Sequence, residues 1–210
     1  MGNKTDNKTL EVISNIISIV FHPVFLPVYG LLIIFNAPTF MVHLPAELKR
    51  VIFLLATINM TVVPLAIMPF LKHRNVIKSY TMDSRQERII PLSIGVMMYI
   101  VTCVIFYSYQ IPQLIKSFTL AASVTSVIIL LVTFRWKISA HGAGMGALLA
   151  TVVVLSIKMM ANLSVLWIPL LVLSGLVLSA RMILKSHKPS QIYLGFITGF
   201  FPVFTVMMIF

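Results

Sequence analysis

Long apolar runs recur along this chain of 210 residues, and short polar segments separate them. Each run holds about 20 residues with few charges, which is the length of helix that crosses the hydrocarbon core of a bilayer. Backbone groups in that environment must be hydrogen-bonded within the segment itself, so such runs fold as helices. The pattern predicts an all-α fold, a polytopic integral membrane helical bundle with six to seven transmembrane helices.

The composition supports this class. Hydrophobic residues make up 59% of the chain and charged residues 10%, and the mean hydropathy is +1.02. The predicted spans cover residues 24–35, 51–71, 89–107, 115–134, 143–159, 163–184 and 192–210. Residues 1–21 are predicted to form a polar, interfacial N-terminus. The spans leave no room for a separate soluble unit, so residues 1–210 are expected to form a single membrane-embedded domain.

Basic residues dominate the polar segments, and the formal net charge is +11. They lie between apolar spans, so lipid headgroups and phosphates are the expected partners, and nucleic acid is not. Two spans return the chain to the same face, which places twelve of the sixteen lysines and arginines together. The other four are Lys49, Arg50, Lys116 and Lys158. The positive-inside rule favours a cytoplasmic location for the basic face of a protein in the cell (cytoplasmic or inner) membrane.

Two pairs of glycines have the spacing of close helix contacts. Gly142 and Gly146 lie on one face of the fifth span, and Gly195 and Gly199 lie on one face of the seventh. Small residues four apart let two helix backbones approach each other. We interpret both pairs as packing sites.

Three polar segments on the basic face carry histidines and cations at membrane depth, where ionisable groups indicate function. The first holds Lys78, Arg85 and Arg88. The second, at the start of the fifth span, is Ser139-Ala140-His141-Gly142. The third holds Arg181, His187 and Gln191, with Pro189 predicted to end the helix of the sixth span. The start of the fifth span is expected to turn unpaired backbone N–H groups toward an anion.

Two imidazoles and a cluster of cations, with neither a pair of acidic residues nor a set of metal ligands, fit phosphoryl transfer without metal or other cofactor. One histidine attacks phosphorus, and the other gives a proton to the leaving oxygen. The cations stabilise the charge on the remaining oxygens.

The segments resemble the signature of the type 2 phosphatidic acid phosphatase family, which reads K-x6-R-P, P-S-G-H and S-R-x5-H-x3-D, over about residues 72–191. The resemblance implies that His187 is the nucleophile that forms a phosphohistidine and that His141 is the general acid. It also implies a phosphate-binding group around them, made up of Arg181, Lys78, Arg85 or Arg88, Ser139, and the backbone near Ala140 and Gly142.

The chain departs from the family pattern at several positions. Ile138 and Ala140 replace the proline and glycine of the second segment. Gln86 follows Arg85 where the family has proline, and Arg88 offers a second register, so both arginines stay open. Gln191 replaces the aspartate that orients the nucleophile; its amide oxygen still accepts a ring N–H but carries no negative charge. A slower enzyme is therefore expected, or one in which another group compensates.

The remaining polar residues receive structural interpretations. His22, His43 and His73 are read as structural or interfacial, and Asp83 and Glu87 as salt-bridge partners of the neighbouring arginines. The predicted function is hydrolysis of a membrane lipid phosphate or diphosphate monoester. Phosphatidate, phosphatidylglycerol phosphate, polyprenyl diphosphate and lipid A phosphate are all compatible substrates.

Other functions stay open from the sequence. A catalytically silent relative that binds or moves phospholipids is the main alternative, because of Gln191. An anion transporter fits less well, because few cations lie in the middle of a span. The side of the membrane that the site faces also stays open, since resemblance to bacterial family members suggests an outward site. The oligomeric state is unknown.

Overall fold

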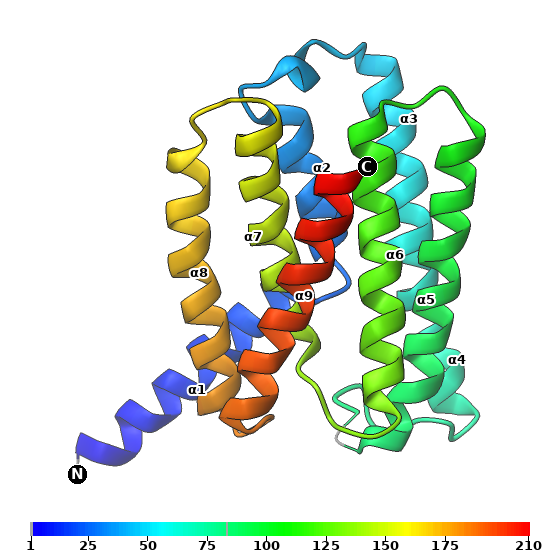
Figure 1. The fold of residues 1–210 in the computed structure, drawn as a ribbon. Helices are drawn as coiled ribbons and strands as arrows, with labels where there is room; N and C mark the ends of the chain where they lie inside the picture. Colours follow the sequence, from blue (N-terminus) through cyan, green and yellow to red (C-terminus); the bar gives the residue numbers. More distant parts are fainter. Residues whose placement is uncertain (1, 83) are drawn as a thin grey trace.

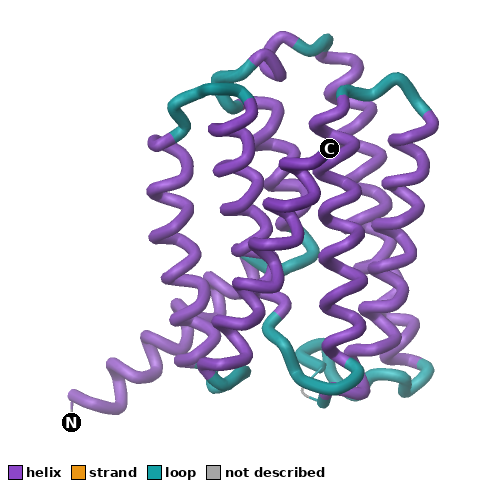
Figure 2. The backbone as a smooth tube through the Cα atoms, viewed as in Figure 1, coloured by secondary structure: helices purple, strands orange, loops and turns teal. Residues whose placement is uncertain are grey.

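The chain forms an elongated bundle of helices (Figure 1). The structure, a computed structural model, describes residues 2–82 and 84–210, with side chains from Lys8 onward except at position 83. Every regular element in this part is helical (Figure 2). Six of its helices are long and apolar enough to cross a bilayer, which confirms an all-α, multi-pass membrane bundle. They are Ala46–His73 (α3, η2 and α4), α5 (Arg85–Ser108), α6 (Gln113–Thr133), α7 (Ala140–Lys158), α8 (Ser164–Ile183) and α9 (Pro189–Ile209).

The first of these spans is built from three helical pieces. It runs through α3 (Ala46–Thr57), the π-helical turn η2 (Ile58–Val62) and α4 (Val63–His73). Pro64 lies in the first turn of α4. A proline has no N–H to donate, and its ring clashes with the carbonyl one turn earlier, so the turn before it widens.

The predicted span at residues 24–35 is helical but short. It forms α2 (Leu26–Asn36), whose eleven residues cover about 16 Å, roughly half of the hydrocarbon core. Pro27 opens α2, and Pro38 follows its end. The described part of the chain therefore has six candidate spans, the lower of the two predicted numbers. The short 3₁₀ helix η1 (Phe40–His43) leads from α2 to α3.

Helix α1 (Gly2–Val20) lies obliquely at the lower end of the bundle in Figure 1 and packs against α8. Its polarity is the reverse of that of a helix on a soluble protein. Ser14 and Ser18 are buried, whereas Ile16 and Ile19 are 56% and 67% exposed. An apolar outer face of this kind suits contact with lipid, and the interfacial location of this segment stays a prediction.

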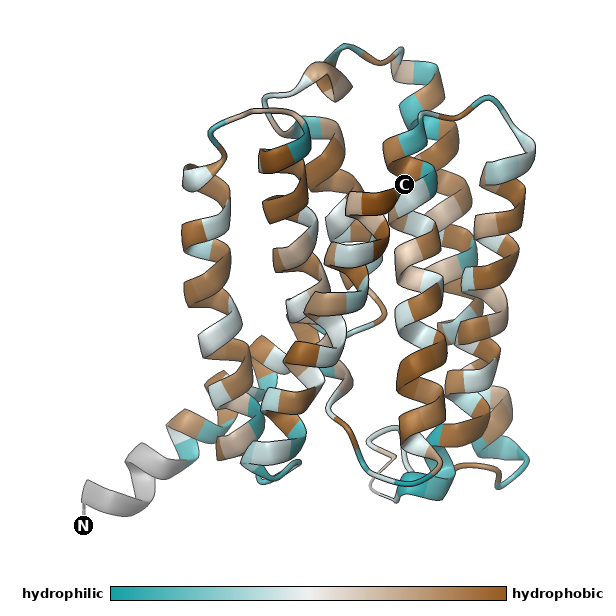
Figure 3. Cartoon of the chain, viewed as in Figure 1, coloured by the Kyte–Doolittle hydropathy of each residue, from teal (hydrophilic) through white to brown (hydrophobic). Residues whose placement is uncertain are grey.

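Polar residues gather toward the two ends of the bundle, and its long sides are mostly hydrophobic (Figure 3). Buried apolar side chains from α2, α3, α6, α7, α8 and α9 form one continuous core. Helix α7 lies at the centre of this arrangement, since 67% of its most apolar stretch is buried inside the protein.

Helices α7 and α9 approach each other through the two predicted glycine pairs. A Cβ atom added to Gly142 would lie 2.7 Å from the backbone oxygen of Ile192, and one added to Gly195 would lie 2.6 Å from that of Ser139. Added Cβ atoms on Gly146 and Gly199 would also collide with backbone of the opposite helix. The interpretation of both pairs as packing sites is confirmed.

We predict that Gly146→Ala destabilises the protein by about 1–3 kcal/mol, because the new methyl group forces two backbones apart. Gly175→Ala is the matched control: this glycine lies within α8, and a Cβ there meets no atom within 4 Å. Thermal unfolding in detergent, followed by size-exclusion chromatography, measures the difference. Equal midpoints for the two variants would contradict this account of the α7–α9 contact.

Candidate functional site

The three polar segments meet at one end of the bundle, the lower end in Figure 1, as the sequence predicts. They form the α4–α5 connection (residues 74–84), the α6–α7 connection (134–139) and the α8–α9 turn (184–188). Helix α1 lies at the same end. The site is therefore assembled from parts of the chain that lie far apart in sequence.

Helices α7 and α9 both begin at this end and run side by side in the same direction. The backbone N–H of Ser139, at the start of α7, donates to the carbonyl oxygen of Gln191, in the first turn of α9 (3.1 Å). The first turn of a helix carries a partial positive charge, which favours anions. Two such charges converge here, each beside one histidine of the predicted site.

The α8–α9 turn holds His187 in place. Helix α8 ends at Ile183, and Lys185 has a left-handed backbone (φ 50°) that reverses the chain. Pro189 is the first residue of α9, so the prediction that it ends the preceding helix is wrong. Proline suits a first helical position because the N–H that it lacks has no helical partner there. His187 lies between these two elements and is only 8% exposed.

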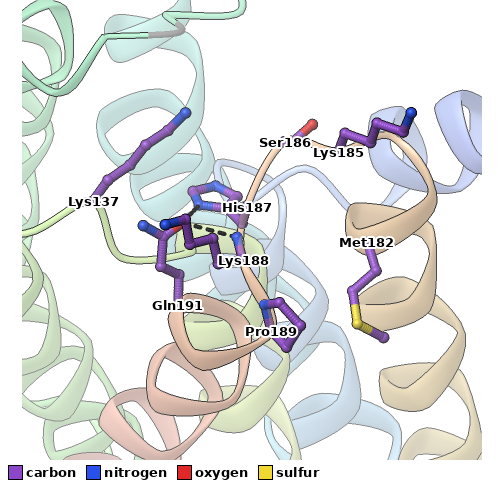
Figure 4. Close-up of a pocket in the computed structure, with 8 residues that line it drawn as sticks. All are labelled: Lys137, Met182, Lys185, Ser186, His187, Lys188, Pro189 and Gln191. Carbon is purple, nitrogen blue, oxygen red and sulfur yellow. Dashed lines mark hydrogen bonds between the residues drawn. The ribbon is translucent and has the colours of Figure 1, made fainter.

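Both nitrogens of the His187 ring have partners, and Figure 4 shows the one formed by Gln191. Arg88 Nη1 lies 3.4 Å from Nε2, and Gln191 Oε1 lies 3.3 Å from Nδ1. A guanidinium only donates, so Nε2 accepts and the proton of the neutral ring lies on Nδ1, which donates to Gln191. The Gln191 oxygen also accepts the backbone N–H of Lys188 (3.0 Å), which fixes the orientation of the amide. The ring therefore presents the lone pair of Nε2 toward Arg88.

The surroundings of His187 favour its neutral form. Burial and the positive charges of Arg88, Arg181 and Lys137 together lower the pKa of the imidazole to about 4, although the hydrogen bond to Gln191 acts in the opposite direction. At neutral pH the ring is uncharged, as a nucleophile must be.

His141 lies in the first turn of α7 and is buried. Its Nε2 is 3.0 Å from the carbonyl oxygen of Ser18, in α1. The ring of His22 packs edge-on against it, with the centroids 5.5 Å apart. Arg181 and His187 are both close enough to interact electrostatically with this ring, so the two predicted histidines belong to one electrostatic environment.

The start of α7 is internally hydrogen-bonded. The Ser139 hydroxyl accepts the N–H of Gly142 (3.3 Å), so the amide of Gly142 is not free, contrary to the expectation of unpaired groups. Serine is a common residue at this position because its oxygen satisfies one of the unpaired N–H groups of the first turn. These bonds fix His141 relative to α9. Contact between a phosphate and Ser139, Ala140 or Gly142 stays a prediction.

Two arginines lie beside the histidines. Arg88 Nε donates to the carbonyl oxygen of Met82 (2.8 Å), which directs its guanidinium toward His187. Arg181 comes from the last turn of α8 and is close enough to Arg88 for the two positive charges to repel each other. Its Nε is buried and has no hydrogen-bond partner among the described residues. A buried donor without a partner is expensive, so this group has an unmet demand for an acceptor.

In the described part of the chain, neither Arg85 nor Lys78 forms a hydrogen bond with either histidine. Arg85 is exposed and donates from Nη1 to the carbonyl oxygen of Arg135 (2.8 Å). Lys78 is exposed as well, and its backbone N–H donates to Glu87 Oε2 (3.2 Å). Of the two arginines that the sequence left open, Arg88 is the one beside His187.

The predicted acidic partners have a different role or lie outside the described residues. Glu87 accepts from the Ser84 hydroxyl (2.9 Å) and from the Lys78 backbone, so it shapes the connection that leads into α5. Asp83, the other predicted partner, is not among the described residues. In the described part of the chain, no three His, Cys, Asp or Glu side chains converge in a group that could bind a metal.

An open pocket of about 500 Å³ adjoins His187 (Figure 4). Lys137, Lys185 and Lys188 line it together with Gln191, so an anion that enters meets several positive charges. Lys137 is not among the site residues predicted from the sequence, although it lies four residues before His141.

His22 was likewise assigned only a structural or interfacial role from the sequence. The one signal available for His22 was a histidine within a stretch that is otherwise largely apolar, a placement that often indicates function.

Comparison of the chain with protein-family models, curated proteins and solved structures finds no match.

We predict that the His187 ring titrates with a midpoint near pH 4. Gln191→Glu raises this midpoint, because a carboxylate at the position of the amide stabilises the imidazolium. Gln113→Glu is the control, since Gln113 is an exposed residue at the far end of the bundle. Nuclear magnetic resonance of ¹⁵N-labelled histidine, assigned with His187→Gln, gives the three titrations. An unchanged midpoint in Gln191→Glu would contradict the assigned contact.

Proposed function

We propose that this protein is a membrane enzyme that hydrolyses a lipid phosphate or diphosphate monoester without a metal ion, through a phosphohistidine on His187. The observation that carries the proposal is a buried, neutral imidazole whose Nε2 lone pair faces Arg88. It lies close to Arg181, whose Nε has no hydrogen-bond partner in the part of the chain that the structure describes. Such an arrangement suits attack on a tetrahedral anion. The chain would then be a divergent relative of the type 2 phosphatidic acid phosphatases.

In the first step, the lone pair of His187 Nε2 attacks phosphorus, and the bond from phosphorus to the lipid oxygen breaks. The bound phosphate anion favours the imidazolium form of His141, which gives a proton to that oxygen and becomes neutral. The oxygen leaves as part of a lipid alcohol or, from a diphosphate, of the lipid monophosphate. Arg88 and Arg181 donate to the other phosphoryl oxygens and stabilise their charge. Arg88 exchanges its contact with Nε2 for one with the substrate.

In the second step, water attacks the phosphohistidine. His141, now neutral, takes a proton from the water, the bond between phosphorus and Nε2 breaks, and inorganic phosphate leaves. Throughout, Nδ1 of His187 donates to Gln191 Oε1, which keeps the ring in one orientation. A neutral amide stabilises the charged ring less than a carboxylate does, so a modest turnover rate is expected.

A lipid substrate suits the position of the pocket at one end of an apolar bundle. Its headgroup would enter among Lys137, Lys185 and Lys188, and its acyl or prenyl chain would stay in the bilayer beside the helices. We propose the cell membrane as the location.

Phosphate release by the purified protein in detergent with chelator present tests the proposal. We expect release from at least one of phosphatidate, phosphatidylglycerol phosphate, a polyprenyl diphosphate or a lipid A phosphate, and none from His187→Ala. Acid-labile, base-stable phosphate on the wild-type protein after a rapid quench would identify the intermediate. Equal release by wild type and His187→Ala would defeat the proposal and favour a protein that only binds or moves phospholipids.

Arg88 and Arg85 provide a matched pair within one turn of α5. We predict that Arg88→Ala lowers kcat by about 10²–10³-fold, the usual effect of removing a donor that stabilises transition-state charge. Arg85→Ala should stay close to wild type, because the Arg85 guanidinium bonds a backbone carbonyl away from His187. Steady-state kinetics on the best substrate measure both. If Arg85→Ala lowered kcat more than Arg88→Ala, Arg85 and not Arg88 would be the arginine that binds the phosphate.

A further inference from the structure

His141 packs against the last turn of α1 and the residues that follow it. The Ser18 carbonyl oxygen is 3.0 Å from His141 Nε2, and the His22 ring meets the His141 ring nearly at right angles (86°). Nothing in the proposed reaction so far uses either residue. Both come from the N-terminal part of the chain, outside the three polar segments.

The hydrogen bonds define which nitrogen of each ring carries the proton. A carbonyl oxygen only accepts, so His141 Nε2 donates to Ser18, and Nδ1 holds the lone pair of the neutral ring. The backbone N–H of Val24 donates to His22 Nδ1 (3.4 Å), so His22 carries its proton on Nε2. With Nε2 of His141 engaged by α1, only Nδ1 is left to exchange a proton with a substrate.

Two further features tie α1 to this site. The Ser18 hydroxyl is buried, and it has no hydrogen-bond partner among the described residues. The opposite face of α1 exposes Ile13, Ile16 and Ile19, which lipid would cover. The bilayer thus holds α1 from outside, while its polar face lies against α8 and His141.

We propose that the segment Ser18–His22 positions His141 for proton transfer: the Ser18 carbonyl holds Nε2, the His22 ring holds the plane of the imidazole, and Nδ1 exchanges the proton. This inference rests on the proposed function. In many enzymes a carboxylate or carbonyl oxygen accepts a hydrogen bond from the catalytic histidine. The Ser18 carbonyl acts in the same way: it fixes the tautomer of His141 and stabilises the ring when it is charged. His22 is a positioning residue, because it acts through His141.

Three variants test the role of His22. In His22→Ala, kcat for metal-free phosphate release falls about 10-fold or more and KM stays nearly constant, because a misplaced acid slows the chemical step. His22→Phe keeps a ring against His141 and recovers most of kcat. His43→Ala is the control, since His43 is exposed at the opposite end of the bundle.

The tautomer of His141, read by nuclear magnetic resonance of ¹⁵N-labelled histidine, separates positioning from a general structural effect. The wild-type protein should show His141 protonated on Nε2, and His22→Ala should show a mixture of tautomers. Wild-type protonation on Nδ1, or a His141 spectrum that is the same in His22→Ala, overturns the inference whatever kcat does. This measurement needs no activity, so absence of phosphate release defeats the proposed function alone.

Discussion

The close contact of α7 with α9 is the constraint on which the site depends. In a membrane no hydrophobic effect drives helices together, so association relies on packing and polar contacts. Gly142 and Gly146 on one helix, with Gly195 and Gly199 on the other, bring the two backbones into direct contact. This contact sets the spacing of the two helix starts.

The same contact explains why the histidines come from separate helices. His141 belongs to the first turn of α7, and His187 lies two residues before the start of α9. The bond from the Ser139 N–H to the Gln191 carbonyl then ties the two starts together. A small shift of one helix along the other would move one imidazole relative to its neighbour, and the glycine contacts oppose such a shift.

The charges of the pocket have two opposing effects on His187. Burial, together with Arg88, Arg181 and Lys137, keeps the free ring neutral, as the proposed nucleophile requires, yet these cations would oppose the positive charge that the ring acquires on attack. In the proposed reaction a bound phosphate resolves the conflict, because its negative charge offsets the cations before the bond forms. In so cationic a pocket, an amide at position 191 leaves more positive charge available for capturing an anion than a carboxylate would.

Hydropathy alone predicted the class of fold and five of the six spans within a few residues, since a bilayer requires about 20 apolar residues per crossing. The shared face of the polar segments followed from counting crossings. The spacing of residues in the sequence could not show whether Arg85 or Arg88 lies beside His187. The difference arises from their positions along α5, where Arg88 lies about 4.5 Å further from the start of the helix. The contact of His22 with His141 was also beyond local sequence, because only the packing of α1 brings this residue to His141.

The short helix α2 has a consequence for hydration. It ends at the end of the bundle opposite the site and covers about half of a hydrocarbon core, and its first residue, Leu26, is buried. His22, four residues earlier, packs against His141, and both His141 and His187 are only 8% exposed, so little bulk water reaches the two rings. In the proposed reaction, a phosphate that reaches them would lose part of its hydration shell, and the guanidinium groups would take the place of that water. In such surroundings each remaining contact would be stronger than the same contact in solution.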